Sequence, residues 1–209
     1  DSDLMVRYET FLKARGICPN SSSYYMRGLR AVYNRAVEKE LTVQRNPFKH
    51  VYTGIDKTVK RAVPLKIIRQ IRDADLTLTP ATDYARDLFM FSFYTRGMSF
   101  VDMAYLKKKD LQNGVLAYRR QKTGQQLFIK WEKPMQEIVE KYDTSGTPYL
   151  LPIIRDMEKD ARKQYKNAAH LVNAKLKKLG EQLGLGIPLT TYVARHALAS
   201  IARSKNIPV

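Results

Sequence analysis

The sequence has very little cysteine: one residue, Cys18, in 209. A single cysteine excludes a disulfide within the chain and leaves no cysteine cluster for a structural zinc site. No apolar run approaches the ~20 residues that cross a bilayer, and the N-terminal segment has no basic stretch followed by an apolar one. We therefore expect a soluble protein of a reducing, cytoplasmic setting, with no membrane partner.

Motifs of several enzyme classes are also missing. The sequence contains no P-loop, no GxGxxG and no HExxH, and its three histidines lie far apart. Its acidic residues form no cluster suited to two-metal nuclease chemistry. These absences predict a protein that uses neither a metal nor a cofactor.

Positive charge, in contrast, is in excess. Lys and Arg number 37 against 20 Asp and Glu, which gives a net charge of +17. With 44% hydrophobic residues and only 10 Gly and 9 Pro, the chain has the composition of folded domains and not of a basic disordered tail. Such a charge attracts polyanions, so nucleic acid is the first partner to expect. An anionic membrane surface would be the second, but the sequence lacks a basic amphipathic helix with bulky apolar anchors.

The first part of the chain has the pattern of a helical unit. Apolar spacing predicts helices over residues 4–15 and 24–40, the second with an N-cap at Asn20 or a following serine. Apolar residues between positions 25 and 37 form one stripe on the second helix, which we expect to face the core. The basic residues of this helix lie off the stripe and predict a basic outer face.

Residues 49–64 are polar, basic and without periodicity, which predicts an interdomain linker. We therefore expect a helical domain over residues 1–60 and a second domain over residues 61–209. The first carries 11 basic and 6 acidic side chains, and the second carries 26 and 14. Both are basic, as expected if both contact one polyanion.

The second part of the chain combines helices with a short sheet. Periodicity predicts helices over residues 65–76, 81–97 and 155–179, and one that begins near Thr190. The run from Leu88 to Tyr94 is apolar on nearly all sides, so its helix is expected inside the core. Alternation on both sides of Lys122-Thr123-Gly124 predicts a β-hairpin. The fold class predicted is mainly α with a small antiparallel β-sheet.

Three cationic residues stand at element boundaries: Arg96 after the buried helix, Lys122 in the hairpin turn, and Arg195 in the first turn of the last helix. Tyr192 and Arg195 are three residues apart and share a helix face near its N-terminus. The free N–H groups and the dipole there favour an anion such as phosphate. An ordinary amphipathic helix with a solvated arginine has the same spacing, so the residues alone leave both interpretations open.

The order of these segments along the sequence resembles that of the tyrosine recombinase (phage integrase) family over nearly the whole chain. YTRGMSFVDMAYLKKKDL resembles the family's first arginine box, YRRQKTGQQLFIKW its β-hairpin lysine, and LTTYVARHALAS its HxxRH box. The amino-acid sequence of these segments is most similar to that of integrases of mobile elements from Bacteroides-like bacteria. The resemblance implies a helical, SAM-like core-binding domain and an α+β catalytic domain that clamp a DNA duplex from opposite sides.

The resemblance also implies a chemistry, site-specific DNA recombination. A tyrosine attacks a phosphodiester and forms a 3′-phosphotyrosyl link, while two arginines and a histidine-like residue stabilise the added charge. A lysine protonates the leaving 5′ oxygen. The implied partners are double-stranded DNA and a homo-tetramer assembled on it, in a bacterial cytoplasm and associated with the nucleoid.

The family's roles fall on particular residues of this chain. The resemblance makes Arg195 the second arginine and Lys122 the proton-donating lysine. It puts Tyr192 where the family commonly has histidine. On the basic face of the second helix, Arg27 and Arg30 are the candidate DNA contacts.

The first arginine departs from the family pattern, in which it lies three residues before an acidic residue. Asp102 matches the acidic residue of this pattern, but the residue three positions before it is Ser99, and Arg96 lies six positions before it. Either the loop allows Arg96 to reach the phosphate, or Ser99 fills the position and the guanidinium comes from elsewhere. An alternative for Arg96 is a simple cap at the end of a helix.

The tyrosine pattern departs as well. A phenol with a pKa of about 10 donates a hydrogen bond but is a poor base, so Tyr192 would orient the phosphate or stabilise its charge. The family's nucleophile follows the second arginine, and residues 196–209 contain no tyrosine. We therefore expect a fragment that binds DNA without cleaving it, incomplete also in its core-binding domain. The alternative is a non-catalytic, basic DNA- or RNA-binding module.

Overall fold

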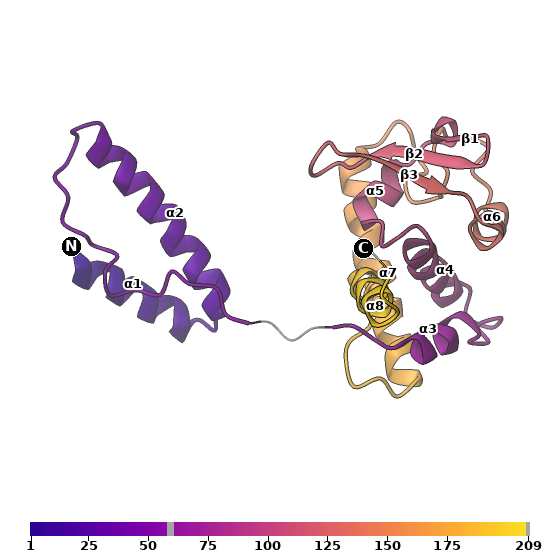
Figure 1. The fold of residues 1–209 in the computed structure, drawn as a ribbon, viewed down its shortest axis with the longest axis horizontal. Coiled ribbons are helices and arrows are strands. Elements are labelled where there is room, and N and C mark those ends of the chain that lie inside the picture. The colour runs from indigo at the N-terminus through magenta and orange to yellow at the C-terminus, as the bar shows by residue number, and fades with distance from the viewer. Residues whose placement is uncertain (58–60, 208–209) are drawn as a thin grey trace. The chain divides into compact units, whose positions relative to one another are not determined.

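The computed structural model describes residues 1–57 and 61–207. It divides into two compact units, Asp1–Val59 and Lys60–Val209, which we call the N-terminal unit and the C-terminal unit (Figure 1). The described residues are mainly helical with one small antiparallel sheet, which confirms the predicted fold class. None of their helices has both the length and the apolar character needed to cross a membrane.

The N-terminal unit is built on a helical hairpin of α1 (Ser2–Ala14) and α2 (Pro19–Glu38). The predicted N-cap of α2 is wrong, because the helix begins earlier, with Cys18 as the N-cap and Pro19 at its first position. Proline suits this position, since the first N–H of a helix has no partner within it. The Asn20 side chain is used elsewhere and accepts a hydrogen bond from the Asp56 N–H at 2.7 Å.

The core of the N-terminal unit is small and lies on an unexpected face of α2. Its buried apolar side chains are those of Leu12, Met26 and Val51. The predicted apolar stripe is wrong as the buried face: Tyr25 and Leu29 are exposed, and Val32 is 70% exposed. The face that is buried carries Ser22 and Ser23 beside Met26, and these small side chains allow the backbone of another segment to approach closely.

The predicted linker over residues 49–64 is too long at both ends. Its first part packs on the N-terminal unit, where the Tyr52 N–H donates to the Glu9 carboxylate at 3.0 Å. Near its other end, Val63 is buried in the core of the C-terminal unit. Residues 58–60 lie outside the described residues. The polar composition of the segment misled the prediction, because polar contacts hold it to α1 and α2.

The C-terminal unit contains six further α-helices and a sheet within its described residues. In chain order they are α3 (Leu65–Arg72), α4 (Pro80–Tyr94), α5 (Phe100–Tyr105), the 3₁₀ turn η1 (Lys108–Asp110), β1 (Leu111–Gln112), β2 (Val115–Arg119), β3 (Gln126–Lys130), α6 (Lys133–Glu140), α7 (Ala161–Gln182) and α8 (Thr191–Ser204). The strands pair antiparallel in the order β1-β2-β3. Ala117 lies opposite Phe128, and Leu116 opposite Ile129, which confirms the predicted hairpin.

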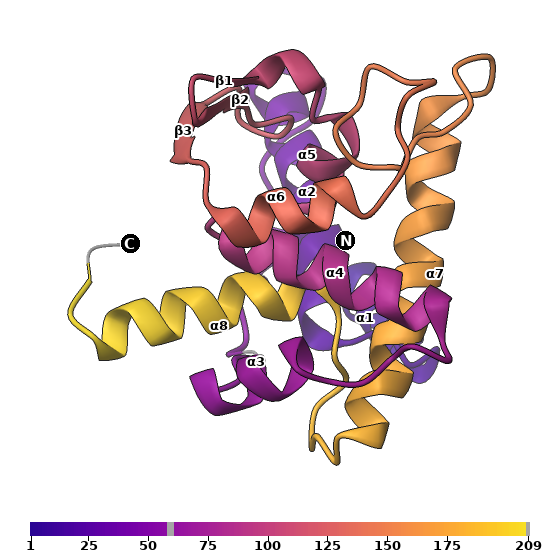
Figure 2. The same cartoon turned by 90° about the vertical axis from the view of Figure 1, so that its right-hand side faces the viewer.

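Helix α4 occupies the centre of this unit, as predicted. Leu88, Phe89 and Phe91 are fully buried. Figure 2 shows α4 crossing the middle of the unit, with α6 on one side and α3 and α8 on the other. A helix surrounded by other helices must be apolar on most of its sides, and this explains the pattern seen in the sequence.

Helix α7 differs from its prediction at both ends. It begins at Ala161, because the Asp160 carboxylate accepts hydrogen bonds from the next free N–H groups and caps it. Met157, predicted inside this helix, lies before it and is 53% exposed. The helix continues past Gly180, and the chain leaves it near Gly184, whose φ of 66° is left-handed.

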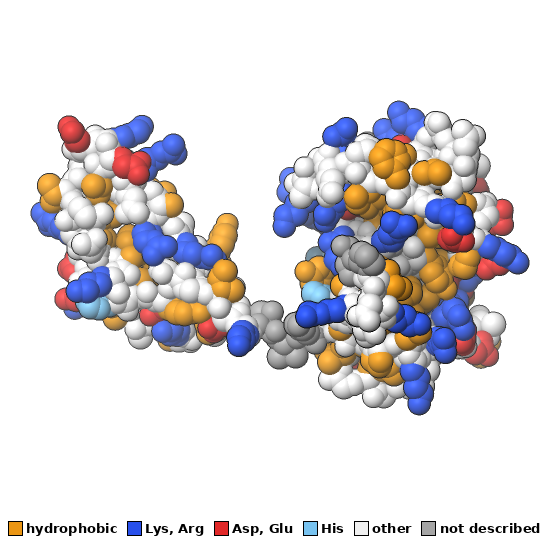
Figure 3. All heavy atoms as spheres, viewed as in Figure 1, with side chains coloured by type: hydrophobic (Ala, Val, Ile, Leu, Met, Phe, Trp, Pro, Cys, Tyr) orange, Lys and Arg blue, Asp and Glu red, His pale blue; other side chains and the backbone are white. Residues whose placement is uncertain are grey.

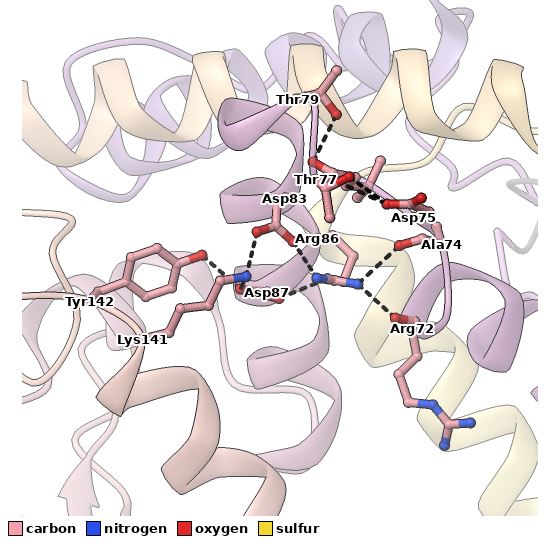
Figure 4. A network of polar contacts seen from close by, with 11 residues as sticks. Arg72, Ala74, Asp75, Thr77, Thr79, Asp83, Arg86, Asp87, Lys141 and Tyr142 are labelled. Atoms are coloured by element: carbon pink, nitrogen blue, oxygen red, sulfur yellow. Dashed lines mark hydrogen bonds and ion pairs between the residues drawn. The ribbon is translucent and has the colours of Figure 1, made fainter.

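A network of charged side chains fixes α4 against its neighbours (Figure 4). Asp83 and Asp87 of α4 both pair with Arg86 and with Lys141, which follows α6. Burial and a hydrogen bond to Asp87 raise the pKa of Tyr142, so its phenol stays protonated and donates at 2.7 Å. Every charge in this network has a partner, which gives it a structural role.

Candidate functional site

Helix α8 begins at Thr191, as predicted, and Arg195 is its fifth residue, at the start of the second turn and not in the first. Its Nε donates a hydrogen bond of 2.6 Å to the carbonyl oxygen of Gly97, which follows α4. Its two Nη groups have no hydrogen-bond partner among the described residues. The guanidinium is therefore held by one N–H while the others are available to an anion.

Gly97 forms the other half of this contact. Arg96 and Gly97 both have left-handed backbones, with φ of 58° and 75°. The Gly97 N–H donates to the Ser92 carbonyl at 2.7 Å and closes the end of α4. A Cβ at Gly97 would lie 3.0 Å from Cα and from Cβ of Arg195. The close approach needs glycine, and sequence reasoning missed this role, although a glycine after an apolar helix was the available signal.

Asp102 connects this region to the hairpin turn. Its carboxylate, on a residue only 4% exposed, accepts a hydrogen bond of 2.5 Å from the Ser99 hydroxyl. Its other oxygen accepts the backbone N–H of Gln121 at 2.9 Å. Ser99 is also the N-cap of α5. The carboxylate thus joins the start of α5 to the residue directly before Lys122.

Lys122 itself is exposed in the turn between β2 and β3. The Gly124 N–H donates to the Arg120 carbonyl at 2.9 Å and closes this turn. The Lys122 ammonium has no hydrogen bond or ion pair with a described residue. Gly97, Asp102 and Gln121 therefore link the three sequence boxes that carry Arg96, Lys122 and Arg195.

Tyr118 lies buried on β2 within this region. Burial raises the pKa of its phenol to about 12, and the Asp102 carboxylate adds to the rise. The guanidiniums of Arg120 and Arg195 act in the opposite direction. One carboxylate and two guanidiniums thus act on the same phenol, and the region has an excess of positive charge.

Two other predicted residues lie at the edge of the region. Tyr192 is 59% exposed, and its ring packs edge-on against His196 with centroids 4.4 Å apart. Neither its hydroxyl nor the Arg96 side chain has a hydrogen-bond partner among the described residues. Arg96 is exposed at the end of α4, so its backbone shapes the Gly97 contact while its guanidinium lies at the surface.

The two predicted DNA contacts of α2 have unequal exposure. Arg30 is exposed, and its Nη1 donates to the Thr53 hydroxyl at 3.2 Å. Arg27 is half-buried, and its Nε is buried without a hydrogen-bond partner in the described part of the chain. The predicted basic outer face therefore includes Arg30 fully and Arg27 only in part.

The surface composition favours an anionic ligand. Lys and Arg side chains spread over the visible face of each unit (Figure 3). Within residues 1–57 and 61–207, His, Cys, Asp and Glu side chains form no group of three that could hold a metal ion. The groups that the region offers to a ligand are guanidiniums, an ammonium and a phenol.

Comparison with known proteins agrees with the sequence resemblance. Residues 1–63 match the family model of the phage integrase SAM-like domain. This match and the fold confirm the predicted resemblance to tyrosine recombinases, while an origin in Bacteroides-like bacteria stays a prediction. No curated protein matches the sequence.

Several solved structures have a similar fold. A dimer of residues 75–356 of lambda integrase bound to a COC′ core site has a TM-score of 0.66 and 12% identity, covering 99% of this chain and 74% of that one. The integrase of transposon Tn1549 in complex with circular intermediate DNA has a TM-score of 0.68 and 14% identity, covering 100% and 74%. A lambda integrase tetramer bound to a Holliday junction has a TM-score of 0.67 and 14% identity, covering 99% and 60%. These likenesses establish the fold.

Proposed function

We propose that this chain is a tyrosine recombinase chain that binds double-stranded DNA and holds one phosphodiester at Arg195 and Lys122 for strand cleavage and rejoining. The observation that carries the proposal is the pair of contacts from Arg195 to Gly97 and from Asp102 to Gln121, at 2.6 and 2.9 Å. They join three distant segments, and the cations of these segments have no carboxylate partner among the described residues.

Arg195 would bind the non-bridging oxygens of the phosphate. Its free Nη groups form a planar fork that suits two oxygens at once, which a lysine ammonium cannot match. During attack the phosphorus gains a ligand and its oxygens gain negative charge. By analogy with oxyanion stabilisation, one such donor contributes about 3–4 kcal/mol to the transition state.

Lys122 would act on the leaving group. When the bond between phosphorus and the 5′ oxygen breaks, that oxygen takes the electron pair and needs a proton, which an ammonium supplies. Asp102 would position this lysine through the Gln121 backbone. Tyr192 would donate a hydrogen bond to the phosphate, and Arg96 would add positive charge at the rim of the site.

The nucleophile is not assigned to a residue of this sequence. Tyr192 precedes Arg195, and residues 196–209 contain no tyrosine. We therefore assign these 209 residues the binding and the charge stabilisation of the phosphate. We expect that this chain forms no covalent adduct on a nicked duplex, and a phosphotyrosyl adduct would contradict this part of the proposal.

Both units would contact one DNA duplex, the N-terminal unit through Arg30 and Arg27. If about 6–10 phosphates are neutralised, affinity should fall by about 10³–10⁵ between 50 and 200 mM salt. Fluorescence anisotropy with a labelled duplex measures this slope. A flat response to salt would contradict DNA binding by this chain.

The remaining expectations belong to the same proposal. The chain would act in the bacterial cytoplasm, on nucleoid DNA, and would assemble as a tetramer on its DNA site. The similar lambda integrase structure is a tetramer bound to a Holliday junction, which supports this assembly. Analytical ultracentrifugation with and without duplex DNA tests it.

A further inference from the structure

The helix that carries Arg195 begins without a cap from its own N-cap residue. Helix α8 begins at Thr191, and the side chain of the preceding Thr190 makes no capping hydrogen bond. The first N–H groups of a helix have no partner within it, so a helix start needs a partner from elsewhere. Tyr192 lies in this first turn, and Arg195 follows Thr191 by about one turn. The orientation of both side chains therefore depends on what holds the start of α8.

Asn173 of α7 supplies this partner. Its Oδ1 accepts a hydrogen bond of 2.9 Å from the Thr191 N–H, and the Thr191 hydroxyl donates to the same oxygen at 3.4 Å. Both residues are half-buried, so water competes little for the bond. The side chain that caps α8 therefore comes from a neighbouring helix, 18 residues earlier in the sequence.

A second contact with α7 fixes the chain just before α8. Leu189 is fully buried, and a Cβ at Gly180 would lie 3.0 Å from the Leu189 Cβ and 3.4 Å from its backbone nitrogen. Gly180 follows Asn173 by seven residues, which is about two turns along the same face of α7. Val193 and Ala194, in the first turn of α8, are fully buried as well. The segment that enters α8 is therefore held by one face of α7 at two points.

Arg195 is thus held in two ways. The Gly97 carbonyl accepts a hydrogen bond of 2.6 Å from its side chain. Its backbone follows the first turn of α8, which Asn173 caps. A backbone carbonyl and a side-chain amide are both neutral groups. They fix the arginine without a carboxylate, so its positive charge stays available to a phosphate.

We propose that Asn173 is a positioning residue of the phosphate site, which fixes Arg195 by capping α8 with a neutral amide. This inference rests on the proposed function and adds a residue outside the three sequence boxes. An aspartate would cap the helix as well, and a carboxylate is even favoured at a helix N-terminus. It would, however, add a negative charge beside the first turn of α8, where it would repel the phosphate. Asparagine keeps the cap and avoids this charge.

Asn173→Ala tests the cap. Its loss should lower the midpoint of thermal unfolding, followed by circular dichroism, by about 2–4 °C. Affinity for a labelled duplex, measured by anisotropy, should fall about three- to tenfold. Since this fall acts through Arg195, it should be largely absent when Arg195→Ala is the starting chain. Unchanged affinity, or an equal loss in the Arg195→Ala background, would overturn the inference.

Asn173→Asp separates positioning of a phosphate site from a merely structural role. The carboxylate can accept the same bond, so the unfolding midpoint should equal or exceed that of the wild type. Duplex affinity should nevertheless fall about three- to tenfold, because the new charge repels the phosphate. A residue that only stabilised the fold would keep the wild-type affinity in this variant, and that result would contradict the inference.

Asn167→Asp is the matched control. It makes the same change on the same helix, at an exposed residue whose side chain has no hydrogen bond in the described part of the chain. Its affinity should change by about twofold at most, and a loss equal to that of Asn173→Asp would overturn the inference. A wild-type chain without salt-dependent duplex binding contradicts the proposed function, whereas wild-type affinity in both Asn173 variants contradicts only this inference.

Discussion

The two units of the chain are stabilised internally by different forces. The C-terminal unit buries a large apolar core around α4. The N-terminal unit has only Leu12, Met26 and Val51 as buried apolar side chains, and leaves large ones such as Val32 exposed. Its residues 49–57 are attached mainly by hydrogen bonds. The comparison teaches that apolar burial supports the proposed phosphate site, whereas polar contacts shape the N-terminal unit.

The largest effect is expected from Phe89→Ala, in the core of the C-terminal unit. Truncating a fully buried phenylalanine costs about 3–5 kcal/mol of unfolding free energy. Trp131 is the sole tryptophan of the chain and lies in this unit, so its fluorescence during urea unfolding measures the loss. A loss below about 1 kcal/mol would show that this core is not what stabilises the unit.

Gly97→Ala is expected to have the next largest effect. A left-handed backbone costs an alanine about 1–2 kcal/mol, and the added Cβ would also meet Arg195 at 3.0 Å. We expect lower stability of the C-terminal unit together with weaker DNA binding. Gly146→Ala is the control, since a Cβ there meets nothing within 4 Å. Equal DNA affinities for the two variants would contradict the role of Gly97 in positioning Arg195.

Ser23→Ala tests the polar attachment in the N-terminal unit. The buried Ser23 hydroxyl donates to the Gly54 carbonyl at 2.5 Å, and leaving this carbonyl without a partner costs about 1 kcal/mol. Amide hydrogen exchange should increase in residues 49–57 while Trp131 fluorescence stays the same. Ser21→Ala is the control, since the Ser21 hydroxyl has a side-chain hydrogen bond only with the Cys18 thiol among the described residues. A change in Trp131 fluorescence would contradict the expectation that this hydrogen bond stabilises the N-terminal unit alone.

Tyrosine ionisation is expected to have the smallest effect on folding stability, and none at neutral pH. Burial raises the pKa values of Tyr84 and Tyr118 in the C-terminal unit to about 12, above the usual 10.0. Folding thus favours their protonated form, so this stability is complete below pH 10 and declines as the pH rises toward 12. Tyrosinate absorbance should show a late-titrating group that Tyr118→Phe removes. Unchanged late titration in that variant would contradict the assignment.

Local patterns predicted most of the C-terminal unit. The apolar run of α4 and the Lys122-Thr123-Gly124 turn are signals carried by neighbouring residues, and the structure has both elements. The exposed stripe of α2 was predicted wrongly because a stripe does not reveal which side a partner covers. Small serines beside Met26 allowed closer packing than the larger side chains of the stripe.

The candidate site was predictable only in part, because its contacts join segments that lie far apart in the sequence. The family resemblance placed Lys122 and Arg195 in recognisable boxes, but it did not predict the bond from Asp102 to Gln121 across 19 residues. Nor could it place Gly97 against Arg195, a contact that spans 98 residues. Contacts at such separations depend on how helices and strands pack, which no local pattern encodes.

A double-mutant cycle on DNA binding tests the central claim, that Arg195 and Lys122 belong to one phosphate site. Residues that share a ligand couple by about 0.5–3 kcal/mol, whereas distant ones add within about 0.5 kcal/mol. We predict coupling between Arg195→Ala and Lys122→Ala, and additivity between Arg195→Ala and Arg30→Ala of the N-terminal unit. Additive effects of Arg195→Ala and Lys122→Ala would contradict a shared phosphate.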